Sequence, residues 1–356
     1  MDCKSELQST LISNSRRCVT LCCITLCLFG AARTASADTV IYATGEKGNK
    51  RSTVHGTILD QTGEQTVVQR ESGTEQSIPT ADVTELQFQR TATHEAADQL
   101  FAAGEYDEAI RSYLSAMGGE PRVWVRRMMV AHLVQAYAMR GQMDRAGRAF
   151  LELLQSDPTT HYFPTIPLAW RPATGSPQLE RQAEQWLAAD EGPTASLIGA
   201  SWLLSGSRRG EAIDRLRQLA ADRDPRIALL AQAQLWRTRI VTADPDEVDR
   251  WETVVQRMPA ELRGGPYFIL GKGRSAVTQH EPAALAFLRV PILYERQRLL
   301  VPWALLSAGR ELEKIDQAEQ AVTLYQEVLR EHAKHPAAAE ANALLERFSD
   351  DSRRKG

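Results

Sequence analysis

Apolar and polar residues alternate with a period of two in the first part of the chain, from Asp38 to about Gln89. Short β-branched runs such as Val54 to Ile58 are separated by Gly-containing turns, at the spacing of about eight to twelve residues that is typical of all-β modules. The pattern predicts five short strands in an antiparallel meander. Five such strands can close into a small barrel, which removes exposed strand edges.

From Thr93 the apolar residues recur with the period of an α-helix. Two stretches repeat the same set of apolar and small positions, which would lie where the two helices of a hairpin meet; we call this set the seam. The first has Leu100, Ala103, Gly104, Ala109, Ile110, Tyr113 and Ala116, closed by Pro121; the second has Leu133, Val134, Tyr137, Gly141, Ala146, Phe150 and Leu153, closed by Pro158. The two glycines are 37 residues apart, and so are the two prolines. Small residues stand where two helices touch, and Gly104 ends a helix where left-handed backbone is needed.

This seam resembles the tetratricopeptide (TPR) family, whose period is about 34 residues. More degenerate units follow, with Ala212, Leu216 and Leu219, then Tyr267, Leu270, Gly271, Ala283 and Phe287, then Leu305, Ala308, Gly309, Leu312, Ala321, Tyr325 and Val328. The resemblance implies a mainly α fold, a TPR-like solenoid of helical hairpins, and the C-terminal unit resembles periplasmic TPR segments of cell-envelope proteins. The number of hairpins between Gln178 and Leu299 stays open by one or two.

The strand region resembles small SH3-like or Sm-like barrels. Those families bind RNA or peptides, or have no known ligand. Aromatic and basic residues are not interleaved here, so nucleic-acid binding has little support. We favour a module that caps the solenoid and shields its first helix.

These patterns divide the chain into six parts. They are a secretory signal peptide at 1–37, a β module at 38–90, TPR-like hairpins at 91–158, a Pro-rich loop at 159–177, a degenerate TPR-like solenoid with a C-terminal capping helix at 178–348, and a charged, frayed tail at 349–356.

The Pro-rich loop contains Pro164, Pro167 and Pro172 with aromatic residues between them, which excludes a continuous helix. Loops of this length are often functional. We favour the interpretation that its aromatic residues pack onto the solenoid and join two sub-stacks. The alternative is a ligand clamp formed by His161, Tyr162 and Trp170.

The N-terminal segment has the layout of a secretory signal. Lys4, Arg16 and Arg17 precede the apolar run Cys18 to Gly30, and Ala35-Ser36-Ala37 predicts cleavage before Asp38. The run is short for a bilayer span, so an uncleaved anchor is the weaker alternative, and no later stretch is long and apolar enough to cross a membrane. We therefore expect export through the inner membrane and a periplasmic or extracellular mature protein.

All five cysteines lie inside this segment, so the mature chain is expected to have no disulfide, thiol nucleophile or Cys-ligated metal. A formal net charge of −3 argues against nucleic acid or anionic lipid as the main partner. The sequence has no His-Glu-x-x-His or Gly-x-Ser-x-Gly motif, and Gly271 to Ser275 lacks the spacing of a phosphate loop. His332 and His335 beside Glu331 could hold a weak metal, but a polar helix end explains them better. We predict no catalytic residue, metal or cofactor.

In TPR arrays, ligands bind the groove lined by the first helix of each hairpin. The resemblance carries this role to His94, Asp98 and Phe101 in the first unit, Met128, Gln135 and Met139 in the second, and Trp303, Arg310 and Glu313 in the last. We therefore predict an exported, non-enzymatic scaffold that binds an envelope protein or peptide segment. The alternatives are an enzyme or small-ligand receptor under the Pro-rich loop, and a structural spacer that docks to the envelope. The sequence does not indicate the partner or the oligomeric state.

Overall fold

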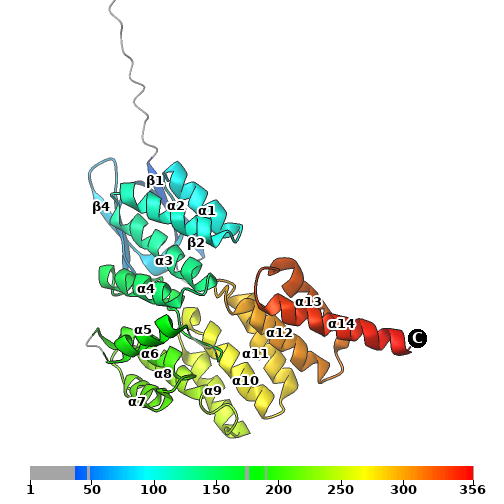
Figure 1. Ribbon diagram of the computed structural model, residues 1–356. Helices are drawn as coiled ribbons and strands as arrows, with labels where there is room; N and C mark the ends of the chain where they lie inside the picture. The colour runs from blue at the N-terminus through cyan, green and yellow to red at the C-terminus, as the bar shows by residue number, and fades with distance from the viewer. Residues whose placement is uncertain (1–36, 46–48, 173–175, 189–190, 356) are drawn as a thin grey trace, which may run out of the picture. The chain divides into compact units, whose positions relative to one another are not determined.

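The computed structural model describes residues 37–45, 49–172, 176–188 and 191–355. The predicted signal peptide lies outside these residues, apart from its last position. The fold is mainly α, with a small N-terminal sheet followed by helices (Figure 1). No helix in the described part is long and apolar enough to cross a membrane.

The five predicted strands are present and antiparallel. They are β1 (Asp38–Thr44), β2 (Lys50–Gln61), β3 (Gln65–Gln69), β4 (Glu75–Pro79) and β5 (Val83–Gln87), in the order β4-β3-β2-β1-β5. The first part of the long strand β2 pairs with β1 and its last part with β3, so β2 joins the two halves of the sheet. Strands β1 to β4 form a meander, whereas β5 does not continue it as predicted but returns to pair with β1. Across the sheet, the side-chain amide of Gln76 donates a hydrogen bond to the Tyr42 hydroxyl (3.1 Å), which brings β4 close to β1.

The rest of the described chain is helical. The helices are α1 (Ala92–Ala102), α2 (Tyr106–Gly119), α3 (Val123–Met139), α4 (Met143–Ser156), α5 (Pro177–Ala188), α6 (Pro193–Leu203), α7 (Arg209–Leu219), α8 (Pro225–Trp236), α9 (Pro245–Arg257), α10 (Gly264–Ala276), α11 (His280–Leu293), α12 (Val301–Glu313), α13 (Ala318–Glu331) and α14 (Ala337–Lys355). The predicted capping helix is α14, but it continues through most of the segment that we expected to be a frayed tail.

A buried aromatic ring from the second helix defines the seam in four hairpins. Tyr113, Phe150, Phe287 and Tyr325 are all fully buried in α2, α4, α11 and α13. A Cβ atom added to Gly271 would lie 2.6 Å from the ring of Phe287, and one added to Gly309 would lie 2.4 Å from that of Tyr325. Gly271 is therefore a packing residue, and the glycines of α10 and α12 let the aromatic rings approach the helix backbone.

The turn inside these four hairpins also has one geometry. The residue two positions before the second helix is left-handed in each: Gly104 (φ 74°), Gly141 (φ 70°), Thr278 (φ 60°) and Asp316 (φ 60°). The first two confirm the glycine signal. In the C-terminal hairpins, Thr278 and Asp316 adopt the same left-handed conformation although each has a Cβ atom. This conformation costs conformational energy for a residue other than glycine.

We expect Thr278→Gly to raise the free energy of unfolding by about 1 kcal/mol, because a β-branched residue is strained in left-handed backbone. Gly141→Ala should lower it by about 1 kcal/mol through the backbone alone, since a Cβ there meets no atom within 4 Å. The matched control is Thr253→Gly, which changes an exposed threonine within α9 and should destabilise. Urea unfolding followed by circular dichroism measures all three. A loss of stability in Thr278→Gly would contradict the strain argument.

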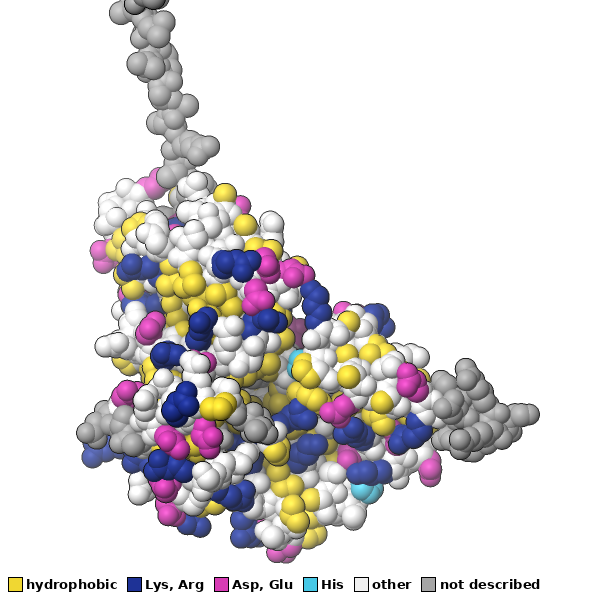
Figure 2. All heavy atoms as spheres, viewed as in Figure 1, with side chains coloured by type: hydrophobic (Ala, Val, Ile, Leu, Met, Phe, Trp, Pro, Cys, Tyr) yellow, Lys and Arg dark blue, Asp and Glu magenta, His cyan; other side chains and the backbone are white. Residues whose placement is uncertain are grey.

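The buried side chains form three clusters. The N-terminal core includes Val40, Ile58 and Ile78 of the sheet together with Phe101 of α1 and Trp124 of α3. A middle core joins α3 to α8, and a C-terminal core joins α8 to α14. On the viewed surface, charged side chains of both signs are interspersed with hydrophobic ones (Figure 2).

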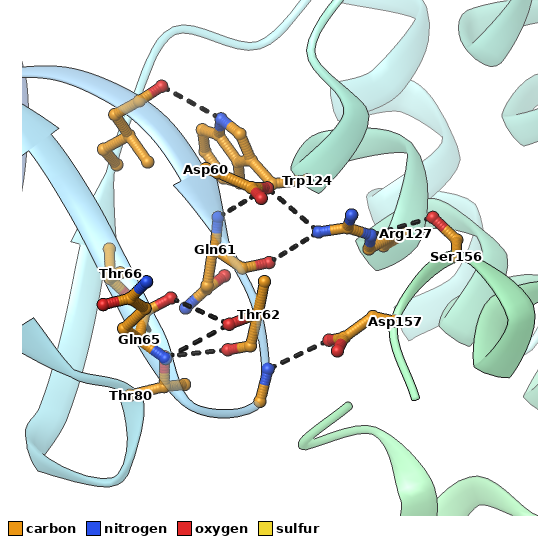
Figure 3. A network of polar contacts seen from close by, with 12 residues as sticks. Asp60, Gln61, Thr62, Gln65, Thr66, Thr80, Trp124, Arg127, Ser156 and Asp157 are labelled. Carbon is orange, nitrogen blue, oxygen red and sulfur yellow. Dashed lines mark hydrogen bonds and ion pairs between the residues drawn. The ribbon is translucent and has the colours of Figure 1, made fainter. Parts of the chain in front are cut away.

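The β module docks onto α3 and the end of α4 (Figure 3). The indole Nε1 of Trp124 donates to the carbonyl of Ile58 (3.1 Å), and one guanidinium nitrogen of Arg127 donates to both Asp60 Oδ1 (2.9 Å) and the Gln61 carbonyl (3.0 Å). The backbone N–H of Gly63 donates to Asp157 Oδ2 (2.9 Å). These bonds and the shared N-terminal core support the docking interpretation, and they extend the contact to the second hairpin.

Candidate partner-binding surface

The Pro-rich loop between α4 and α5 lies against the helices and contributes to the core. It has one 3₁₀ turn at Phe163–Thr165, and its other described residues up to Pro172 have no helix or strand. Phe163, Ile166 and Leu168 are buried in the middle core, and the rings of Phe163 and Phe150 meet edge to face. These residues pack onto the solenoid, as we expected of the loop's aromatic side chains.

Backbone groups of the loop bond to side chains of α6. Ser201 Oγ accepts a hydrogen bond from the backbone N–H of Ala169 (2.9 Å) and donates to Gln234 Oε1 of α8 (2.9 Å). Trp202 Nε1 donates to the carbonyl of Pro167 (2.9 Å). An extended chain cannot satisfy its own backbone groups, so these side chains replace the missing partners.

Further along, the loop reaches α8, α10 and α12. A guanidinium nitrogen of Arg237, next to α8, donates to the carbonyl of Arg171 (3.4 Å), and a Cβ on Gly265 of α10 would lie 2.0 Å from the ring of Trp170. The guanidinium carbon of Arg171 lies 3.1 Å from the centre of the Trp303 ring of α12. The loop thus crosses α6, α8, α10 and α12, the first helices of successive hairpins. We call the surface that these four helices present to the loop the first-helix face.

Trp170 contacts both the middle and the C-terminal core, so the loop joins two sub-stacks as we expected. Of the residues named for a ligand clamp, His161 is exposed and Tyr162 is half-buried, with ring centres 3.9 Å apart. The buried part of the loop fills the space that a ligand beneath it would need.

The first-unit candidates lie together but are largely covered. His94 and Phe101 are buried, with 1% and 6% of their surfaces exposed. Asp98 Oδ1 accepts from the hydroxyl of Tyr113 (2.7 Å) and lies 3.6 Å from His94 Nε2 and 3.7 Å from His132 Nδ1. Burial lowers the pKa of His94 and, to about 4, that of His132, and it raises the pKa of Tyr113 well above its usual range.

Residues that follow α11 and α13 cover this first hairpin. The Arg298 guanidinium lies 4.8 Å from the centre of the Phe101 ring, and Lys334 Nζ forms an ion pair with Glu105 Oε1 (2.6 Å). Gln297 also donates to the carbonyl of Pro164 in the loop (3.1 Å). A partner therefore reaches the candidates of the second unit more easily than His94 or Phe101.

Among the second-unit candidates, Met128 packs partly into the N-terminal core. Gln135 and Met139 are partly exposed on α3. Among the last-unit candidates, Glu313 accepts from the Tyr325 hydroxyl and from Arg347, so neighbouring side chains engage it. Arg310 is exposed and pairs with Glu340 Oε2 of α14 (2.8 Å).

The structure adds cationic side chains that sequence reasoning missed. Arg171 and Lys272 join Trp303 and Arg310 around α12, and Lys272 Nζ lies 3.4 Å from Ser307 Oγ. Lys272 lies in the run Gly271 to Ser275, which we considered as a phosphate loop because of its glycines. Arg171 directly follows Trp170, which we considered as part of a ligand clamp. No local motif indicates that the two cations share one surface, because the loop's route brings them together.

Metal-ligand geometry is absent from the described residues, where no three His, Cys, Asp or Glu side chains gather as a metal site requires. His335 Nδ1 instead accepts from the backbone N–H of Ala337 (3.1 Å) at the start of α14, and its ring meets that of Trp303 edge to face. Burial and the neighbouring His332 lower the pKa of His335 to about 4.

Comparison with known proteins does not show a family for this chain. No protein family profile matches the chain, and no curated protein matches it. A solved structure of the assembly chaperone of RpL4 (Acl4), residues 1–338, is similar at 16% sequence identity, with a TM-score of 0.28, over 74% of this chain and 98% of that chain. A likeness at this TM-score carries no functional inference.

We expect Ser201→Ala to lower the free energy of unfolding by about 2 kcal/mol, because it leaves the buried N–H of Ala169 without a partner. Limited proteolysis should then cut the Pro-rich loop faster. Ser207→Ala removes an exposed hydroxyl and is the control, with no change expected. Equal unfolding curves and cleavage rates for Ser201→Ala and wild type would show that the loop does not depend on this anchor.

Protonation of His335 should destabilise the fold. Its folded pKa lies below the unfolded value, so its contribution is complete above about pH 6.5 and is lost as the pH falls toward 4. Between pH 7 and 4.5 we expect the protein to lose about 1 to 2 kcal/mol more than a His335→Asn variant, whose amide oxygen can accept the same N–H without titrating. Denaturant unfolding at several pH values measures the difference. Parallel pH profiles would exclude this role of His335.

Proposed function

We propose that this chain is an exported, non-enzymatic, TPR-like scaffold that binds another protein of the cell envelope. The observation that carries the proposal is the geometry shared by four hairpins: each has a fully buried aromatic ring in its second helix and a left-handed residue two positions before that helix, and in two of them the ring packs against a glycine of the first helix. Stacked hairpins of this kind use their apolar sides on each other and present an extended face for partners. The five-stranded module, which shares a core with α1 and α3, serves as the cap of the stack.

Gln135 and Met139 of α3 are the residues that we propose to contact the partner in the N-terminal hairpins. Both are partly exposed, and the Gln135 amide makes no hydrogen bond to any described residue. Flexible Met side chains and unpaired amides adapt to extended peptides and amphipathic helices. Asp98 and Phe101 hold the first hairpin against α3 through His132, and the buried His94 lies beside Asp98.

Export is the second part of the proposal, and the sequence pattern before Asp38 supports it. The mature protein is then periplasmic or extracellular. The alternative of a catalytic or small-ligand site beneath the Pro-rich loop has weaker support, because that loop's side chains fill the middle core.

Affinity capture from crosslinked cells, with the full chain tagged at its C-terminus, tests the proposal. We expect one dominant envelope protein, and we expect the double variant Gln135→Ala/Met139→Ala to lose most of it while keeping the wild-type melting curve. Gln256→Ala, which changes an exposed amide side chain on α9, is the control and should retain the partner. The purified tagged protein should begin at Asp38. Background alone in repeated captures would refute the scaffold, and an intact N-terminus would refute export by a cleaved signal.

A further inference from the structure

A group of cations lies on the first-helix face, beside Arg171 of the Pro-rich loop. Arg171 of the loop stacks on Trp303, Lys272 of α10 lies beside Ser307, and Arg310 is two turns further along α12 from Trp303. We call Arg171, Lys272 and Arg310 the cationic patch. Figure 2 shows Lys and Arg side chains gathered over α10 and α12, next to hydrophobic surface.

The patch has few acidic partners. Arg171 and Lys272 form no ion pair with any carboxylate among the described residues, and Arg310 shares the region with a single exposed acid, Glu340. Nearby Glu311 is buried and pairs with Lys314 and His280, and its charge offsets only part of the effect of burial and of the neighbouring cations on Lys272. Arg237, which also flanks Arg171, bonds to carbonyl and amide oxygens and has no carboxylate partner there.

The charges act on one another. Burial, with the neighbouring charges of Arg171, Arg310 and Lys314, lowers the pKa of Lys272, and Glu311 opposes this only in part. Burial is also the main cause that lowers the pKa of Arg171, where Glu340 acts against it and Arg310 acts with it. Like charges held together in partly desolvated surroundings repel one another until an anion binds between them. The whole chain has a formal net charge of −3, so an attraction for anions at this patch comes from the local arrangement of these cations and not from the net charge.

The same face already binds an extended chain. The loop crosses α6 to α12 with its backbone bonded to Ser201, Trp202 and Arg237 and with its aliphatic side chains buried. Side chains on helices can therefore satisfy an extended backbone here. Past Trp303, α12 continues along the face with Ser307, Arg310 and the half-buried Lys272 of α10 beside it.

We propose that the cationic patch binds an acidic, extended peptide segment of the partner protein, which lies along α10 and α12 beside Arg171, Lys272 and Arg310. This inference rests on the proposed scaffold function and names the chemistry of the partner. Carboxylates of the segment pair with Arg171 and Lys272, and Arg310 exchanges Glu340 for a carboxylate of the partner. The Arg171 guanidinium is held by Trp303, so little side-chain entropy is lost when it binds.

The test uses the full chain and a short fluorescein-labelled peptide of alternating Glu and Ser residues. Fluorescence anisotropy should give a Kd at least about tenfold lower for this peptide than for the versions with Gln or Lys in place of Glu, and binding should weaken between about 50 and about 300 mM NaCl. Arg171→Glu/Lys272→Glu should raise the Kd about tenfold or more, since it reverses two of the charges.

Two further variants separate charge from folding. Arg171→Gln/Lys272→Gln removes the charge without adding repulsion and should weaken binding several-fold with an unchanged melting curve. Arg250→Glu/Arg257→Glu makes the same change of net charge at two exposed α9 arginines and should bind like wild type. Equal affinity for the Glu and Gln peptides, equal effects of the patch and α9 variants, or tighter binding of a short oligothymidylate than of the acidic peptide would overturn the proposal.

The patch variant in the affinity capture separates this inference from the scaffold itself. If Arg171→Glu/Lys272→Glu retains the partner that Gln135→Ala/Met139→Ala loses, the scaffold stands and the cationic patch is not its partner site. If wild type binds the acidic peptide through the patch but captures no partner, the patch stands and the scaffold fails.

Discussion

The close approach of two helices at a small residue, opposite a buried aromatic ring, is the constraint on which this structure depends. Phe287 packs against Gly271 and Tyr325 against Gly309, at distances that leave no room for a Cβ atom. A hairpin packed this tightly is stiff, but its outer apolar sides remain uncovered and must stack on a neighbour. Each hairpin therefore needs a neighbour on either side, and the first and last hairpins need a module or helix that covers their outer apolar side.

The middle of the array departs from the seam and uses other contacts. The rings of Trp236 and Trp251 stack with centres 5.4 Å apart, and Trp186 fills the space above Gly147. The Pro-rich loop adds Trp170 against Gly265 and so contacts two cores at once. Bulky indole rings and an inserted chain together provide the contact area that regular repeats obtain from their seam.

The local sequence pattern predicted the strands and helices well, but it predicted poorly the contacts between parts of the chain that are distant in sequence. The period-two alternation located all five strands, and the seam located the four hairpins whose aromatic rings are fully buried. Even the left-handed turns at Thr278 and Asp316 occupy the position that glycine marks in the first two hairpins. These features depend on neighbours a few residues apart, which a sequence displays directly.

The path of the loop could not be predicted in the same way. The proximity of Arg171 to Trp303, of Lys334 to Glu105 and of Gln297 to Pro164 depends on how many hairpins turn between them and at what angle. Helix periodicity contains no information about those angles. The sequence therefore indicated Trp303 and Arg310 as surface candidates, whereas the cations that complete their surroundings became visible only in three dimensions.

The filled first-helix face limits how this protein can recognise a partner. In an array whose groove is empty, the groove itself provides the largest binding area, but here the protein's own loop occupies it from α6 to α12. A partner that followed the same path would have to displace buried Phe163, Ile166 and Leu168, and would lose the free energy of their burial. Recognition at the ends of the occupied stretch avoids that cost. Gln135 and Met139, which are partly exposed on α3, and Arg310, which is exposed on α12, remain available to a partner while the loop stays in place.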